Sequence, residues 1–161
     1  DGPIAIRYPR GSAHQGLREY QVPVEYGRSE IIRKGKKIAV LGVGSMIPSC
    51  MEICKGLKDD GYDPTFVNAR FVKPLDVDLL DELAKDHSLF VTVEENVKSG
   101  GYGEHVSAYM EACHPEIRVL SAAVWDRFVP QGNVESLRSR IGLGVEDIRQ
   151  AIEDSEELRE Q

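Results

Sequence analysis

Strand-like and helix-like segments alternate regularly along the middle of this chain. Continuous apolar runs predict strands at residues 36–44, 65–69, 88–93 and 117–124. Apolar residues at helical spacing predict helices in the intervals between them, at 46–58, 77–85 and 101–113. Because strands joined by helices require right-handed crossovers, the pattern predicts a parallel α/β sheet with helices on both faces.

The predicted helices carry signals for their ends and for their buried faces. Asp76 is placed to cap the helix at 77–85, and Gly61 stops the first helix. The inward face of that first helix is predicted to carry Met46, Cys50, Ile53, Cys54 and Leu57. The inward face of the helix at 101–113 is predicted to carry Val106, Tyr109, Met110 and Cys113.

Segments on either side of this alternation complete the expected fold. Residues 29–33 are strand-like, and the short link 34–36 predicts a tight hairpin to the next strand, which would add one antiparallel edge strand. At the start of the chain, residues 3–8 are predicted to form a strand, followed by a linker without periodicity. Two short amphipathic helices are predicted near the end, beginning at Asn133 and Val145.

Charge and hydropathy argue against two classes of partner. The 161 residues include 20 basic and 27 acidic side chains, and the basic ones are scattered, so no strip of positive charge suits a nucleic acid. No apolar run approaches the roughly 20 residues that span a bilayer, and no leader is evident. We therefore expect no membrane partner and a cytoplasmic protein.

The three cysteines are expected to be reduced thiols, since an odd number in a chain of this size argues against a disulfide framework. Cys50 and Cys54 lie four residues apart, a spacing that could serve a metal ion if histidines converged on it. Both fall on the apolar face of their helix, where cysteine behaves as a small hydrophobic residue. The sequence therefore favours packing over metal binding.

The stretch L-G-V-G-S at 41–45 follows a strand and opens a helix, as in dinucleotide-binding turns. Ile47 stands where the third glycine is needed, and Pro48 removes an N–H from the first turn of the helix. A tight strand-to-helix turn is the favoured interpretation.

The stretch 91–105 lies at the carboxyl end of a predicted strand, where open α/β sheets build their sites. Glu94 and Glu95 should point to opposite faces of that strand, which makes them a poor acid–base pair. One of them could cap the next helix across the glycines at 100–103, so an interface-forming loop is favoured over a catalytic one.

No complete catalytic set is evident in the sequence. The four histidines show no nucleophile–base spacing, and no nucleophile elbow, zincin or phosphate-loop motif is present. Residues 125–132 are predicted to form a turn that contains aromatic residues and a proline. Packing of this turn against its own domain is the favoured interpretation, and contact with another domain is the alternative.

Five ordered motifs make the sequence recognisable. They are R-Y-P-R-G at 7–11, F-V-K-P-L-D at 71–76, V-T-V-E-E-N at 91–96, G-G-Y-G at 100–103 and F-V-P-Q-G at 128–132. In order and spacing they resemble the C-terminal region of the 1-deoxy-D-xylulose-5-phosphate synthase family, which is transketolase-like and thiamine-diphosphate-dependent. The resemblance implies the transketolase C-terminal fold, a mixed and mostly parallel sheet of about five strands with helices on both faces.

The resemblance also implies an activity that resides largely outside this chain. The family condenses pyruvate with D-glyceraldehyde 3-phosphate, with loss of carbon dioxide, in the biosynthesis of isoprenoids, thiamine and pyridoxal. Its thiamine diphosphate and Mg²⁺ are bound by domains that have no counterpart here, so no cofactor or catalytic residue is expected on this chain, and the isolated chain is expected to be inactive. The implied partners are the rest of the same polypeptide and a homodimer partner.

One site residue carries over from the family. The second arginine of R-Y-P-R-G, Arg10, matches a residue that holds the phosphate of the aldehyde, whereas Arg7 is expected in a structural ion pair or in solvent. The motif implies that residues 1–11 end a preceding central domain, that 12–28 form a linker, and that 29–161 form the transketolase C-terminal-like domain. The strand at 3–8 should then be disordered or packed on a neighbouring molecule.

Two alternatives remain open at this point. The chain could be the C-terminal region of a transketolase or of a pyruvate dehydrogenase beta subunit, which F-V-P-Q-G and R-Y-P-R-G together disfavour. It could also be a non-catalytic interaction module, which the unpaired first strand and the missing initial methionine disfavour.

Overall fold

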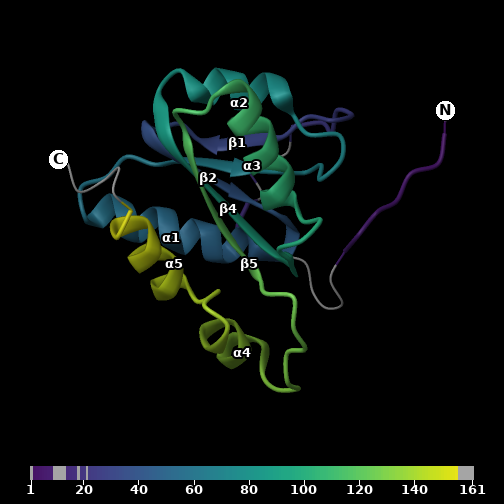
Figure 1. Ribbon diagram of the computed structural model, residues 1–161, viewed down its shortest axis with the longest axis vertical. Coiled ribbons are helices and arrows are strands. Elements are labelled where there is room, and N and C mark those ends of the chain that lie inside the picture. Colours follow the sequence, from purple (N-terminus) through teal and green to yellow (C-terminus); the bar gives the residue numbers. More distant parts are fainter. Residues whose placement is uncertain (1, 9–13, 18, 21, 156–161) are drawn as a thin grey trace.

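A five-stranded sheet forms the centre of the computed structural model, which describes residues 2–8, 14–17, 19–20 and 22–155. The strands are β1 (Glu30–Arg33), β2 (Lys37–Gly42), β3 (Thr65–Asn68), β4 (His87–Val97) and β5 (Arg118–Val124). Their order across the sheet is β1-β3-β2-β4-β5, and all neighbours are parallel except β1 and β3 (Figure 1). The predicted mixed, mostly parallel sheet is confirmed.

Helices cover both faces of the sheet and give the domain two apolar layers. A 3₁₀ turn, η1 (Gly44–Met46), leads into α1 (Ile47–Asp59), which packs on one face together with α5 (Val145–Glu153). Helices α2 (Val77–Ala84) and α3 (Tyr102–Cys113) pack on the other face. Because β2, β3 and β4 are covered on both sides, their sequences are nearly continuous apolar runs.

The predicted helix faces are largely correct. All five residues assigned to the inward face of α1 are buried, and Asp76 caps α2 by accepting a hydrogen bond from the backbone N–H of Leu79. The prediction for Cys113 is wrong: this last residue of α3 is exposed, whereas Val106 and Met110 are fully buried.

The predicted hairpin between the first two strands of the sheet is also wrong. Strand β1 is the antiparallel edge strand, but its partner is β3, because β2 already has β3 on one side and β4 on the other. The link 34–36 crosses the start of β3, where the N–H of Gly35 donates to Thr65 Oγ1 at 2.9 Å. The N–H of Lys36 donates to the carbonyl of Asp63.

Residues 2–8 do not form the strand that their sequence predicts. They are exposed, they pair with no strand of the described part of the chain, and they run away from the folded body (Figure 1). A strand needs a neighbouring edge to satisfy its backbone, and no such edge of the sheet lies beside this segment.

The last connection leaves the body of the domain. After β5, residues 125–133 form a loop without regular structure, and α4 (Val134–Arg140) follows with Asn133 as its N-cap, as predicted. This region extends beyond the carboxyl ends of β4 and β5, and α4 buries none of its residues (Figure 1). In the described part of the chain, no helix combines the length and the apolar character that a membrane crossing requires.

Candidate functional site

The carboxyl edge of the sheet has one point where the chain direction across the sheet reverses. From β2 the chain passes through α1 to β3 on one side, and from β4 it passes through α3 to β5 on the other. These two helices lie on opposite faces of the sheet. Open α/β sheets bind their ligands at such a reversal, so the ends of β2 and β4 are the candidate site.

Glu95 is the centre of the polar contacts at this point. Its carboxylate accepts hydrogen bonds from the hydroxyl of Ser45, in η1 after β2, and from Nε of Arg138 in α4 at 2.8 Å. Its backbone carbonyl accepts a hydrogen bond from Nη2 of Arg7 at 3.2 Å. The bond from Arg138 is the main reason that the pKa of Glu95 lies below its ordinary value, and Ser45 adds to it. Glu95 is therefore a charged residue that joins three segments.

Glu94 has a different role, although it is the neighbouring residue. Its buried carboxylate accepts hydrogen bonds from the backbone N–H groups of Tyr102, at 3.0 Å, and Gly103, at 2.8 Å. These are free donors in the first turn of α3, where negative charge is also favoured by the helix dipole. The prediction that one of the two glutamates caps this helix is confirmed.

The glycine-containing turn at 41–45 is packed tightly against α1. A Cβ atom on Gly42 would lie 2.7 Å from Sγ of Cys50, and Gly44 has a φ of +54°, which favours glycine. Pro48 occupies the first turn of α1, where it removes an N–H group. These contacts agree with the expected tight strand-to-helix turn.

The two arginines of the opening motif have different outcomes. Arg10, the predicted phosphate ligand, lies outside the described residues. Arg7 is exposed, as expected, and its hydrogen bond to the backbone carbonyl of Glu95 places this end of the segment 2–8 beside the carboxyl end of β4.

A second arginine contact at the carboxyl edge was missed from the sequence. Arg70 follows β3, and its guanidinium pairs with the buried carboxylate of Glu30 in β1 and donates to the carbonyl of Pro23 at 3.4 Å. The pair forms because β1 lies against β3, with Glu30 opposite Asn68. Because the sequence predicted a hairpin between β1 and β2, it did not predict the contact between Arg70 and Glu30.

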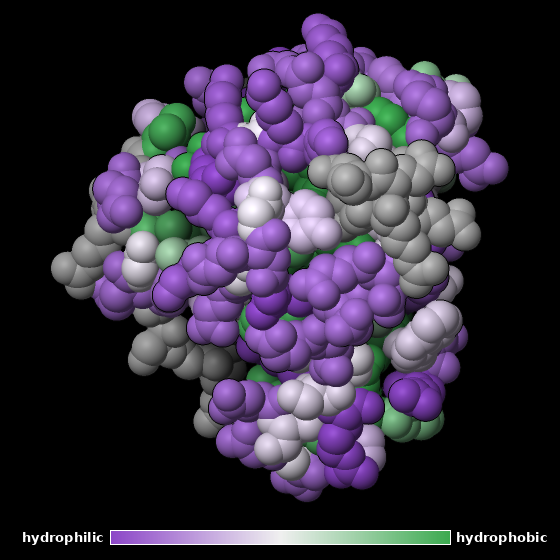
Figure 2. Space-filling view, turned by 90° about the vertical axis from the view of Figure 1, so that its left-hand side faces the viewer, coloured by the Kyte–Doolittle hydropathy of each residue, from purple (hydrophilic) through white to green (hydrophobic). Residues whose placement is uncertain are grey.

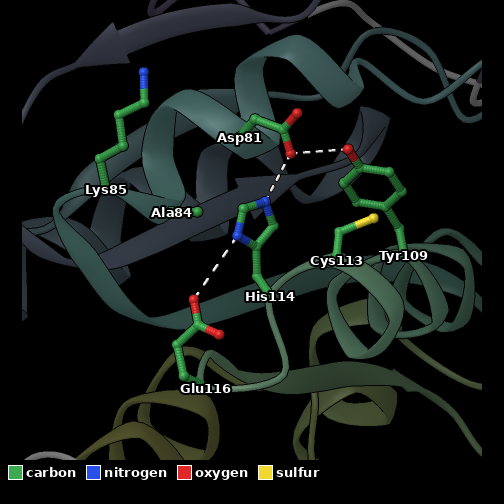
Figure 3. Close-up of a pocket in the computed structure, with 7 residues that line it drawn as sticks. All are labelled: Asp81, Ala84, Lys85, Tyr109, Cys113, His114 and Glu116. Atoms are coloured by element: carbon green, nitrogen blue, oxygen red, sulfur yellow. Dashed lines mark hydrogen bonds and ion pairs between the residues drawn. The ribbon is translucent and has the colours of Figure 1, made fainter.

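A hollow of about 530 Å³ lies between α2 and α3, away from the carboxyl edge (Figure 3). In it, Asp81 accepts hydrogen bonds from the hydroxyl of Tyr109 and from Nε2 of His114, both at 2.8 Å. The bond from His114 is the main cause that holds the pKa of Asp81 below its usual range. Since His114 directly follows α3, these contacts link the two helices at the amino end of β5.

Histidines and cysteines do not gather into a metal site in the described part of the chain. No group of three or more His, Cys, Asp or Glu side chains there could hold a metal ion.

His87 is a buried structural residue, with one ring nitrogen 2.7 Å from Thr65 Oγ1 and the other 2.8 Å from the carbonyl of Leu83. Burial lowers its pKa, which favours the neutral ring.

Comparison with protein families matches residues 27–148 to the transketolase C-terminal domain. Curated relatives include 1-deoxy-D-xylulose-5-phosphate synthases from Lachnoclostridium phytofermentans, 42% identical over 149 residues, and Chlorobaculum tepidum, 40% identical over 148 residues. These matches cover 92% and 91% of this chain but 24% and 23% of the relatives. The chain therefore spans about a quarter of the length of these relatives.

Solved structures agree with this assignment. A split-gene transketolase, described as an inactive beta4 tetramer, superposes with a TM-score of 0.78 at 28% identity over 86% of this chain and 44% of that one. A transketolase from Campylobacter jejuni superposes with a TM-score of 0.52 at 14% identity, over 80% of this chain and 19% of that one, and shows the fold alone. The sequence match, the sheet order and the superposition agree, and the chain belongs to the transketolase C-terminal domain family.

Proposed function

We propose that this chain is the C-terminal domain of a 1-deoxy-D-xylulose-5-phosphate synthase, an enzyme that condenses pyruvate with D-glyceraldehyde 3-phosphate and releases carbon dioxide. The observation that carries the proposal is the 42% identity to such a synthase over nearly the whole chain. Identity to the split-gene transketolase is 28%, so the synthase is favoured over a transketolase. The polypeptide as a whole is the enzyme, and this chain alone is inactive.

Arg10 is the residue of this chain that we assign to the substrate. A guanidinium group stays charged at every working pH, and its planar fork can donate two hydrogen bonds to phosphate oxygens at once. Arg7, three residues earlier in the sequence, donates a hydrogen bond to the backbone carbonyl of Glu95 at the carboxyl end of β4.

Thiamine diphosphate and Mg²⁺ are the cofactors of the proposed whole enzyme. Thiamine diphosphate supplies a carbanion equivalent that accepts the two-carbon unit of pyruvate. We assign both groups to the parts of the polypeptide that precede this chain, as the family resemblance implies; among the described residues, no group of three or more His, Cys, Asp or Glu side chains could hold the metal ion. The contribution of this chain is binding and orientation of the second substrate.

Partners and compartment form part of the same proposal. The domain works with the rest of its own polypeptide and within a homodimer, in the cytoplasm. The three free cysteines fit a reducing compartment.

The test uses the full-length polypeptide, with thiamine diphosphate and Mg²⁺ added. It should form deoxyxylulose phosphate from pyruvate and D-glyceraldehyde 3-phosphate, and it should not transfer two-carbon units between ketose and aldose phosphates. Transketolase activity without deoxyxylulose phosphate formation would refute the assignment. Turnover of pyruvate by the isolated 161-residue chain would refute the inactivity of this piece.

A substitution at Arg10 tests its proposed role in substrate binding. Arg10→Ala should raise the KM for D-glyceraldehyde 3-phosphate roughly ten- to a hundredfold, the usual effect of losing a hydrogen bond to a charged group, while the KM for pyruvate stays unchanged. Arg10→Lys should recover part of the loss, because it keeps the charge but not the fork. Arg118→Ala, which removes an exposed arginine at the amino end of β5, is the matched control. Equal KM values for Arg10→Ala and the control would remove Arg10 from the substrate site.

A further inference from the structure

The region that follows β5 exposes large apolar side chains in close succession. We call residues 125–140 the arm; it comprises the loop after β5 and helix α4. Phe128 is fully exposed, more than half of the surface of Trp125 and of Val134 is exposed, and Val129 is also exposed. Isolated exposed apolar residues are ordinary, but four of them within residues 125–134, two of them aromatic, favour a contact surface.

Defined contacts hold the arm in place although α4 buries none of its own residues. Arg138 donates to Glu95 at 2.8 Å, and the side chain of Asn133 accepts from the N–H groups of Glu135 and Ser136 at 3.0 and 3.3 Å. Nζ of Lys98 lies 5.0 Å from the centre of the Trp125 ring. The arm is thus attached to the body of the domain on both sides of its exposed loop, through Trp125 and Arg138.

The left-hand side of the molecule in Figure 1, away from residues 2–8, is mostly hydrophilic, with apolar residues in small patches between polar ones (Figure 2). The part of this face that is drawn in colour offers no broad apolar surface to a partner.

The contacts of Glu95 bring the start of the chain to the arm. Arg7 binds the backbone carbonyl of Glu95, and Arg138 of the arm binds its carboxylate. The segment 2–8 also exposes Ile4, Ile6 and Tyr8, so it presents apolar surface of its own. The chain spans 24% of a curated relative, and the family that it matches is described as a C-terminal domain, so we take most of the remaining length of the polypeptide to precede it. The preceding polypeptide consequently arrives next to the arm.

We propose that the arm docks on the region that precedes this chain in the same polypeptide, with Phe128 and Trp125 inserted into an apolar depression of that region. The inference rests on the proposed function, since it takes the chain to be one domain of a longer enzyme. Aromatic anchors of this kind dominate the energetics of interfaces, and the surrounding polar contacts exclude water. Glu95 then serves as the positioning residue that holds the arm and the entering segment together.

Cross-linking from position 128 in the full-length polypeptide identifies the occupant. Phe128 is replaced by p-benzoylphenylalanine, and light and heavy nitrogen-labelled polypeptides are refolded together and illuminated. Docking within one polypeptide predicts cross-links from the arm to the preceding region that join equal labels only. Mixed-label cross-links would assign the arm to a second copy and overturn the proposal, as would cross-links that never reach the preceding region.

Amide hydrogen exchange supplies a second, independent readout. Residues 125–134 should exchange at least about tenfold more slowly in the full-length polypeptide than in the isolated chain. Phe128→Ser and Val134→Ser should restore fast exchange in the full-length polypeptide. The matched control is Val22→Ser, because Val22 is 59% exposed against 57% for Val134 and contacts Glu30 at the opposite side of the sheet. Equal effects of Val22→Ser and Val134→Ser would overturn the assignment to the arm.

The isolated chain is measured over a range of concentrations as well. Exchange that slows with the concentration of this chain alone would indicate self-association and contradict the proposal. Deoxyxylulose phosphate formation is assayed on the same full-length protein, which separates the two claims. A protein that makes the product while its arm stays unprotected refutes docking only, and a protein with a protected arm and no product refutes the function only.

Discussion

Glu94 and Glu95 are adjacent in sequence, yet their carboxylates hold different helices. Glu94 accepts hydrogen bonds from the N–H groups of Tyr102 and Gly103 in α3, and Glu95 accepts one from Arg138 in α4. The alternation of side chains along a strand sends neighbouring residues to opposite sides. The carboxyl end of β4 thereby holds α3 on one face of the sheet and α4 beyond the edge of the sheet.

Replacing Glu94 should destabilise the domain. In Glu94→Ala, two buried N–H groups of α3 lose their acceptor, so the free energy of unfolding should fall by about 1–3 kcal/mol. Glu94→Gln keeps one acceptor oxygen and should lose less. Urea unfolding measures both, and Glu111→Ala, at an exposed position of α3, should change stability by no more than about 0.5 kcal/mol. A loss for Glu94→Ala as small as that of the control would contradict the capping role.

Replacing Arg138 should loosen the arm and leave the sheet intact. The pair with Glu95 is partly exposed, so Arg138→Ala should cost the arm about 1 kcal/mol or less. Amide exchange at 134–140 should then speed up severalfold, whereas exchange in β2 and β4 should not change. Equal acceleration in the sheet would show that the arm and the sheet unfold together.

The same ion pair should respond to acid. Because Arg138 lowers the pKa of Glu95 in the folded chain, the stabilisation is complete above the ordinary value of 4.5 and is lost as the pH falls through the lower folded pKa. Protection factors at 134–140 in the unmodified chain, which correct for the slower intrinsic exchange in acid, should therefore fall over that acidic window and approach those of Arg138→Ala.

Local signals made much of this fold predictable. The capping by Asp76 and the inward face of α1 depend on residues a few positions apart, and the apolar runs of β2 and β4 follow from burial on both sides. The role of Glu94 was accessible for the same reason, because its partners lie only eight and nine residues further on.

Contacts that depend on strand order were not predictable. The pair of Arg70 with Glu30 requires β1 to lie against β3, and sequence proximity favoured a hairpin with β2 instead. The contacts of Glu95 with Ser45 and Arg138 join residues 50 and 43 positions apart, which no local pattern encodes. Arg10 was identified by resemblance to a family, and it lies outside the described residues.

His87 should make the stability of the domain sensitive to pH below neutrality. Burial lowers its folded pKa below the ordinary value of 6.5, so the unfolded chain takes up a proton at a pH where the folded chain does not. Stability should therefore fall as the pH drops below 6.5, until the folded pKa is reached. Urea unfolding at about pH 7.5 and about pH 5.5 measures the loss, which should be smaller in His87→Gln than in the unmodified chain. His105→Gln, at an exposed position of α3, should leave the loss unchanged, and an equal loss in all three proteins would exclude His87 as its cause.

The three thiols should separate into one reactive and two protected groups. Cys113 is exposed at the end of α3, whereas Cys50 and Cys54 are buried against the sheet. Burial raises the pKa of Cys54 to about 12 and also raises that of Cys50, so neither forms appreciable thiolate, the reactive species, near neutral pH. A thiol reagent such as dithionitrobenzoate should therefore modify one cysteine quickly in the folded chain and the other two only as the domain unfolds. Cys113→Ser should abolish the fast reaction without changing the slow one, and rapid modification of all three thiols in the folded chain would show that α1 does not shield its two cysteines.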